Sequence, residues 1–349
     1  MIPGNINESY ERDGAIIRTR TQWLLVIISL LFMLTFPMIL PSYWVSTLNF
    51  ALVAVVIVLG LHVITGLCGQ ISLGHSAMVA VGAYTTGVLV VKFGVNYWAC
   101  LPVAMIMSGL VGLVFGAPSL RIKGFYLAMS TLAAQFIIMW LINHPFYDLT
   151  DGGVGLYVPP PTIVGINFGE KPNFFYLALF FAIVIIVIVR NLQRSRVGRA
   201  LVAIRDNDLA ASIMGINVFS YKLIAFFIGC CIAGIGGWLW TINALVITPQ
   251  MFTLSESIWY LGMIIVGGMG STTGAVAGAM FIRLLDLLSG FLSAQIAIWA
   301  PVIGALALST FNYILFGVVV IVFLIFEPRG IYHLWENFKL SYRLYPYSY

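Results

Sequence analysis

Charged residues are scarce in this sequence. Only 8% of its 349 residues are Asp, Glu, Lys or Arg, whereas 61% are hydrophobic and the mean hydropathy is +1.02. Soluble domains have about a quarter of their residues charged, so this composition excludes a globular protein in water. Cysteine is also rare, and the four present form no C-x-x-C pair and no pattern typical of a disulfide framework.

Motifs for catalysis and nucleotide binding are missing as well. The sequence contains no G-x-x-x-x-G-K-[ST] run, and therefore no P-loop to hold ATP phosphates. It contains no H-E-x-x-H, no G-x-S-x-G and no cysteine cluster suited to zinc. We therefore expect no catalytic residue, no metal site and no cofactor bound by this chain. Energy for any active process must come from a partner chain or from an ion gradient.

Apolar runs make up most of the sequence. Many are close to the roughly 20 residues that a helix needs to cross a bilayer, so they predict an all-α, polytopic integral membrane protein. About ten transmembrane helices are expected, and eight to ten fit the pattern, because three windows are short or interrupted by glycine and could re-enter instead of spanning. The windows are 23–40, 47–65, 76–91, 97–117, 124–143, 174–189, 223–243, 257–270, 274–292 and 303–326, of which the third, eighth and ninth are the weakest.

The placement of Lys and Arg orients these helices, since loops rich in both residues stay in the cytoplasm. With the N-terminus inside, fourteen of the seventeen basic residues are cytoplasmic, Lys92 and Lys171 lie outside, and Arg283 lies in the membrane region. The net charge of +5 is spread over these loops, so it indicates topology and attraction to anionic lipid, not nucleic-acid binding. The expected parts are cytoplasmic tails at 1–22 and 327–349, a transmembrane domain at 23–326, an outer loop at 144–173 and an inner loop at 191–221.

The outer loop is rich in turn-forming residues. Asp151, Gly152 and Gly153 are followed by prolines 159–161, which predicts ordered turns and no helix. The loop could dock an external partner or simply connect two spans, and the sequence leaves both open.

The inner loop ends in a predicted short helix. Its start carries the capping residues Asp206, Asn207 and Asp208, and Gly215 suits a left-handed cap at its end. The residues between are small or apolar, which is unusual in a cytoplasmic loop. We expect this helix to bury a face in a groove of a soluble partner, with a position flat on the lipid interface as the alternative.

Five blocks of sequence carry a family resemblance. They are GLCGQISLGHSAMVAVGAY (66–84), LRIKGFYLAMSTLA (120–133), SRVGRALVAIRDNDLAASIMGIN (195–217), VGGMGSTTGAVAGA (266–279) and EPRG (327–330). Together they resemble the LivM-type permeases of branched-chain amino acid ABC transporters. The blocks lie between about residue 59 and residue 330, so the resemblance covers most of the chain.

The resemblance implies a permease subunit in a bacterial inner membrane, not an enzyme. It implies four kinds of partner: a second related permease, giving a heterodimer; two cytoplasmic ATPase subunits; a periplasmic binding protein; and the lipid bilayer. In ABC importers the ATPase-coupling segment resembles EAA followed by three residues and Gly, and Leu209 occupies the acidic first position here. The residues assigned to this coupling loop are Arg196, Gly198, Arg199, Arg205, Asp206, Asp208, Ala210, Ala211 and Gly215.

Two glycine-rich clusters and one ion pair are candidates for the translocation path. Irregular backbone in a bilayer must be buried in protein or line a polar cavity, and broken helices expose ends that can meet the charged groups of an amino acid. Close helix packing is the alternative explanation for glycine. The candidates are Gly66, Gly69, Gln70, Ser72, Gly74 and His75; Gly267, Gly268, Gly270 and Ser271; and Arg283 with Asp286, which can pair across one helical turn or mark a segment at the interface.

Other functions fit these observations less well. An ion-gradient-driven secondary transporter needs buried carboxylates, and only Asp286 falls in the expected membrane region. A passive channel would need a ring of charge or a repeated filter sequence, and neither is visible. Urea and other small solutes remain alternative substrates, because related permeases serve them too.

Overall fold

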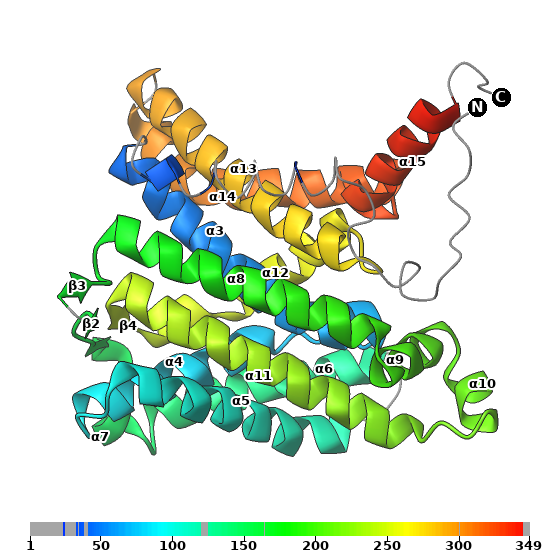
Figure 1. Cartoon of the computed structure of the whole chain (residues 1–349). Helices are drawn as coiled ribbons and strands as arrows, with labels where there is room; N and C mark the ends of the chain where they lie inside the picture. The colour runs from blue at the N-terminus through cyan, green and yellow to red at the C-terminus, as the bar shows by residue number, and fades with distance from the viewer. Residues whose placement is uncertain are drawn as a thin grey trace.

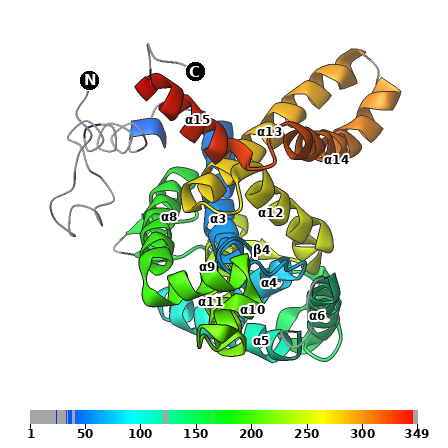
Figure 2. The same cartoon turned by 90° about the vertical axis from the view of Figure 1, so that its right-hand side faces the viewer.

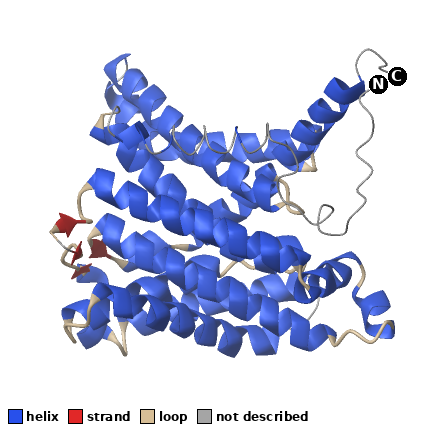
Figure 3. Ribbon diagram, viewed as in Figure 1, coloured by secondary structure: helices blue, strands red, loops and turns tan. Residues whose placement is uncertain are grey.

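The computed structural model describes residues 24, 33, 35–37, 41–119, 125–163, 165–299 and 301–344. It is built almost entirely of helices, with a few two-residue strands at one end (Figure 3). The all-α, multi-pass class expected from the sequence is confirmed. In the described residues, six helices are long and apolar enough to cross a membrane, or seven if the bent pair Asn312–Phe326 and Gly330–Lys339 forms one span. The expected window 23–40 lies almost entirely outside the described residues.

The helices follow the remaining predicted windows. The long ones are α3 (Ser42–Leu61, continued by the π-helix η1, His62–Leu67), α5 (Tyr97–Ser119), α6 (Phe125–Asn143), α8 (Lys171–Arg194), α11 (Val218–Ala244), α13 (Thr272–Trp299) and α14 (Pro301–Phe326). The third and eighth windows form shorter helices, α4 (His75–Val91) of 17 residues and α12 (Leu254–Gly267) of 14 residues. Both fall short of the roughly 20 residues needed to cross a bilayer alone. The ninth window, in contrast, lies within α13, which has 28 residues.

Helix α3 lies at the centre of the molecule. It packs against α8, α11, α12 and α13 and touches the start of α4 through His75 (Figure 2), and 94% of its most apolar 18-residue window is buried. A helix that is apolar on every side is typical of a buried position. Glycines bring its neighbours close together: a Cβ atom on Gly82 of α4 would lie 2.6 Å from the Cα of Gly234 in α11.

The predicted inner and outer loops lie at opposite ends of the bundle (Figure 1). One end carries α9 (Arg196–Asp206) and α10 (Asp208–Ile213). The other carries α7 (Tyr147–Thr150), the 3-10 turns η2 (Gly152–Val154) and η3 (Pro249–Phe252), and the antiparallel pairs β1 (Leu156–Tyr157) with β4 (Val246–Ile247) and β2 (Thr162–Ile163) with β3 (Ile166–Asn167). The amphipathic helix α15 (Gly330–Leu344) follows α14.

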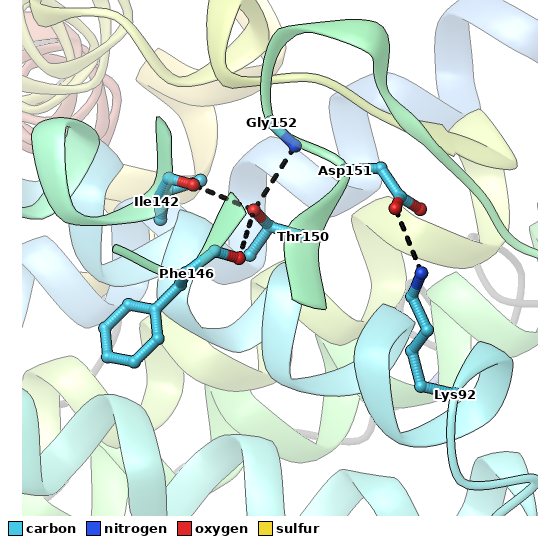
Figure 4. A network of polar contacts seen from close by, with 6 residues as sticks. All are labelled: Lys92, Ile142, Phe146, Thr150, Asp151 and Gly152. Atoms are coloured by element: carbon cyan, nitrogen blue, oxygen red, sulfur yellow. Dashed lines mark hydrogen bonds and ion pairs between the residues drawn. The ribbon is translucent and has the colours of Figure 1, made fainter. Parts of the chain in front are cut away.

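A polar network orders the loop predicted to be outside (Figure 4). The Thr150 hydroxyl lies 2.8 Å from the Ile142 carbonyl oxygen and 2.9 Å from that of Phe146, which share its one proton, and it accepts from the Gly152 N–H at 3.3 Å. The Lys92 ammonium pairs with Asp151 at 2.9 Å. The loop is therefore ordered as expected, but it includes one helical turn, α7, where only turns were predicted.

Candidate functional site

The coupling loop contains two helices, and the prediction found only the second. Helix α9 is 11 residues long and is capped by the preceding residue Ser195, whose hydroxyl accepts the Gly198 N–H at 3.2 Å. Its inner face is formed by the buried residues Leu201 and Ile204. Ser195 as a cap, followed by apolar residues at helical spacing, is the signal that would have located α9.

Helix α10 has the ends that the sequence predicted. The Asn207 side chain accepts the N–H groups of Leu209 at 3.1 Å and Ala210 at 3.0 Å. Gly215 has φ +85°, and the Ile216 N–H closes the end on the Ala211 carbonyl at 3.1 Å. This six-to-one bond beside a left-handed glycine is the Schellman form of helix termination.

The face of α10 that points away from the protein is apolar. Leu209 is 66% exposed, Ile213 85% and Met214 82%, whereas Ala211 is 4% exposed and packs inward. Helix α10 therefore protrudes from the end of the bundle that faces the viewer in Figure 2, with three large hydrophobic side chains uncovered in the described structure. Of the other coupling-loop residues, Arg196 and Arg199 are exposed, and Gly198 packs closely against the end of α8.

The first glycine cluster connects η1 to α4. Gly69 has φ +73°, and the chain then crosses to α4 through the buried residues Gln70 and Ser72. A Cβ atom on Gly66 would overlap the Met269 carbonyl oxygen, and one on Gly74 would overlap the Thr131 carbonyl oxygen. Close packing therefore accounts for these two glycines.

Side chains from other helices occupy the first turn of α4, which begins at His75. The Ala77 N–H donates to Gln135 of α6 at 2.9 Å, and the Ser76 N–H donates to Ser257 of α12 at 2.9 Å. Just before the helix, the Leu73 N–H donates to the Thr131 hydroxyl at 3.0 Å. The exposed helix end expected here for a substrate carboxylate is therefore bonded to protein groups in this conformation.

The second glycine cluster forms the turn between α12 and α13. Gly267 approaches α13 so closely that an added Cβ atom would lie 2.7 Å from the Gly274 carbonyl carbon. Gly268 has φ +110° and lies against Arg329, and Ser271 accepts the Gly274 N–H at 3.2 Å. Gly270 and Ser271 line a pocket of about 300 Å³ with Arg190 and Tyr332 among the other walls.

Arg283 forms the predicted pair with Asp286, but the cluster is larger than the sequence indicated. Its guanidinium lies 3.6 Å from Asp286 and 3.7 Å from Glu256 of α12. Asn312 of α14 donates to Asp286 at 2.8 Å. These contacts link α12, α13 and α14. The Arg283 side chain is only 13% exposed. Glu256 and Asn312 come from distant segments, and no local pattern pointed to them.

Arg205 brings the coupling loop and the first cluster together. Its Nη1 donates to the Gly66 carbonyl oxygen at 3.0 Å, and its Nε and Nη2 donate to Asp206 at 3.1 and 3.0 Å. Asp208 lies 3.9 Å from Lys222 of α11. Between these groups is a polar pocket of about 430 Å³, lined by Cys68, Gly69, Gln70, Ile71, Leu127, Ile204, Arg205, Asp206, Asn207, Asp208 and Lys222.

Comparison with known proteins agrees with the sequence resemblance. The chain is 29% identical over 325 residues to the high-affinity branched-chain amino acid transport system permease protein LivM of Escherichia coli (strain K12), a match that covers 83% of this chain and 75% of that protein. It is 25% identical over 240 residues to the probable branched-chain amino acid transport permease protein LivM of Methanocaldococcus jannaschii, covering 66% and 68%.

A second kind of permease is also related. The chain is 22% identical over 260 residues to the high-affinity branched-chain amino acid transport system permease protein LivH of Salmonella typhimurium, covering 69% of this chain and 82% of that protein. No solved structure matches the chain. Residues 43–324 match the family described as branched-chain amino acid transport system / permease component. Because this match covers most of the chain, the protein belongs to that permease family.

Proposed function

We propose that the chain is the membrane-spanning permease subunit of an ATP-binding cassette importer and that it carries branched-chain amino acids into a bacterial cytoplasm. In this proposal it lies in the inner membrane with both termini in the cytoplasm. It pairs with a second, related permease, binds two cytoplasmic ATPase subunits and receives substrate from a periplasmic binding protein. The chain itself hydrolyses no ATP.

The uncovered apolar face of α10 carries this proposal. Three large hydrophobic side chains between 66% and 85% exposed lie at the end of the bundle assigned to the cytoplasm. Beyond the membrane such a face needs a groove on a soluble partner. The partner that an importer places there is its ATPase. A gradient-driven transporter would have no use for this helix, and the acidic groups Glu256 and Asp286 that it would need both lie beside Arg283.

The substrate class is tested by uptake into proteoliposomes. The chain, co-expressed with its partner subunits and supplied with its binding protein, is expected to accumulate radiolabelled leucine only when ATP is present on the side of the ATPase subunits. Excess valine or isoleucine should compete, because all three side chains are branched and apolar, and urea should not. ATP-dependent accumulation of urea without leucine uptake would instead assign urea as the substrate.

The orientation is tested by labelling two engineered cysteines of matched exposure. Val154 is 79% exposed at the end assigned to the periplasm, and Met214 is 82% exposed at the end assigned to the cytoplasm. A membrane-impermeant maleimide added to intact spheroplasts is expected to label Val154→Cys and to spare Met214→Cys. The wild-type chain sets the background, since Cys68, Cys100 and Cys230 are buried and Cys231 is half-buried. The reverse labelling pattern would invert the topology.

A further inference from the structure

Arg205 lies on one of the two chain connections between α10 and the helix bundle. It lies in the last turn of α9, and only Asp206 and Asn207 separate it from the start of α10 at Asp208. Helix α9 is packed on the body through its buried residues, whereas α10 protrudes. A partner that displaces α10 therefore acts on Arg205 through this short link, and on α11 through Asp208 and the segment 214–217.

The Arg205 guanidinium binds the end of the central span, which consists of α3 and its continuation η1. The carbonyl of Gly66 lies at the end of the 26-residue helix Ser42–Leu67, where carbonyl groups lack a partner within the helix and carry partial negative charge. Arg205 donates to this carbonyl at 3.0 Å across 139 positions of sequence. A cation at this end of a helix both satisfies the carbonyl and interacts favourably with the helix dipole.

The rest of the Arg205 side chain fits against the same glycine cluster. A Cβ atom on Gly69 would lie 2.8 Å from the Arg205 Cγ, so the arginine stem occupies the space that a side chain there would need. A Cβ atom on Gly270 of the second cluster would lie 3.6 Å from Nη1. Gly66 in turn contacts Met269, so both glycine clusters and the guanidinium meet at one place.

The surroundings of Arg205 allow it to move. The last turn of the span is a π-helix, whose hydrogen bonds are less favourable than those of an α-helix and which often marks a functional site. The pocket of about 430 Å³ lies directly beside the guanidinium. Gln70 lines that pocket, is 3% exposed, and its amide makes no hydrogen bond within the described structure. Gln70 thus adds an amide without a hydrogen-bond partner to the pocket that Arg205 also lines.

We propose that Arg205 is a positioning residue that transmits the movement of α10 to the end of the central span and to both glycine clusters. The inference rests on the proposed function, because it assumes that an ATPase moves α10. The bond from Arg205 to Gly66 and the packing of its stem on Gly69 make α9 and the η1 turn move together. Without these two contacts, α10 still docks on the ATPase and ATP is still hydrolysed. The ATPase cycle then no longer rearranges the translocation path.

The test compares uptake with ATP hydrolysis in proteoliposomes that contain the whole importer. Arg205→Ala is expected to retain its ATPase subunits and their hydrolysis while the number of solutes carried per ATP falls by about tenfold, the factor that corresponds to the loss of one charge-assisted hydrogen bond. Arg205→Lys keeps the charge but cannot reach Gly66 and Asp206 together, so it should be intermediate. Lys339→Ala removes an exposed charge from α15 and should leave the ratio unchanged.

The outcomes separate this inference from the proposed function. An unchanged ratio in both Arg205 variants, or parallel losses of hydrolysis and uptake that leave the ratio intact, would overturn the positioning role. If Arg205→Ala fails to assemble, the ratio in Arg205→Lys decides. If the wild-type importer shows no ATP-dependent uptake at all, the proposed function fails, and the inference fails with it.

Discussion

Replacing Ile213 and Met214 together by glutamate is expected to abolish ATP-driven uptake while the chain remains folded in the membrane. Both side chains are more than 80% exposed, so two carboxylates there cost the isolated chain little. In a complex with the ATPase the same positions would be desolvated. Burying an unpaired charge costs several kcal/mol, and each 1.4 kcal/mol is about a tenfold loss in affinity. We expect ATPase binding to weaken by at least about a hundredfold.

The matched control for this prediction lies at the opposite end of the molecule. Val154 is 79% exposed, so Val154→Glu places the same charge on an equally exposed site that is far from α10. It should retain ATPase binding, which is the quantity compared between the two variants. Charged residues at Ala211 would be less informative, because that side chain is 4% exposed and a charge there would disturb the packing of α10 on its own chain. Wild-type uptake by the double glutamate variant would refute α10 as the docking surface.

Replacing Gly278 by alanine is expected to destabilise the fold strongly, although only one methyl group is added. A Cβ atom at this position would overlap the Met263 carbonyl oxygen and lie 2.7 Å from the Cα of Gly267. These are backbone atoms, so α12 and α13 would have to separate. Overpacking of this kind costs about 1–3 kcal/mol, which for a chain of this size corresponds to a melting temperature lower by about 2–4 °C. The measurement is thermal unfolding of the purified chain or complex in detergent.

Gly317 provides the control for the same substitution. It lies in helix α14, and a Cβ atom there would meet no atom within 4 Å. Gly317→Ala should leave the melting temperature unchanged or raise it slightly, because alanine favours a helix by about 1 kcal/mol over glycine. Equal stability of the two variants would show that α12 and α13 do not need the close approach at Gly278.

Features set by local interactions were predictable from the sequence. The two ends of α10 follow from Asn207 and Gly215, whose capping contacts lie within a few residues. The pair of Arg283 with Asp286 spans one helical turn and was predicted for the same reason. Helix α9 was missed because its arginines obscured the short apolar repeat at Leu201 and Ile204.

Features set by packing between distant segments were not predictable. Hydropathy located the glycine clusters but could not show that they meet, nor that Arg205 bonds to Gly66. It also could not show that Gln135 and Ser257 would occupy the first turn of α4. Close helix contacts explain Gly66, Gly74 and Gly267 without a substrate. The role of these residues in a translocation path remains a prediction.

Co-purification from native membrane tests the central claim most directly. The chain, extracted in a mild detergent through an affinity tag, is expected to bring with it one related permease and two copies or kinds of ATPase subunit, and the complex should hydrolyse ATP faster when substrate-loaded binding protein is added. Recovery of the chain alone, with solute uptake that follows an ion gradient and ignores ATP, would contradict the assignment as an importer subunit.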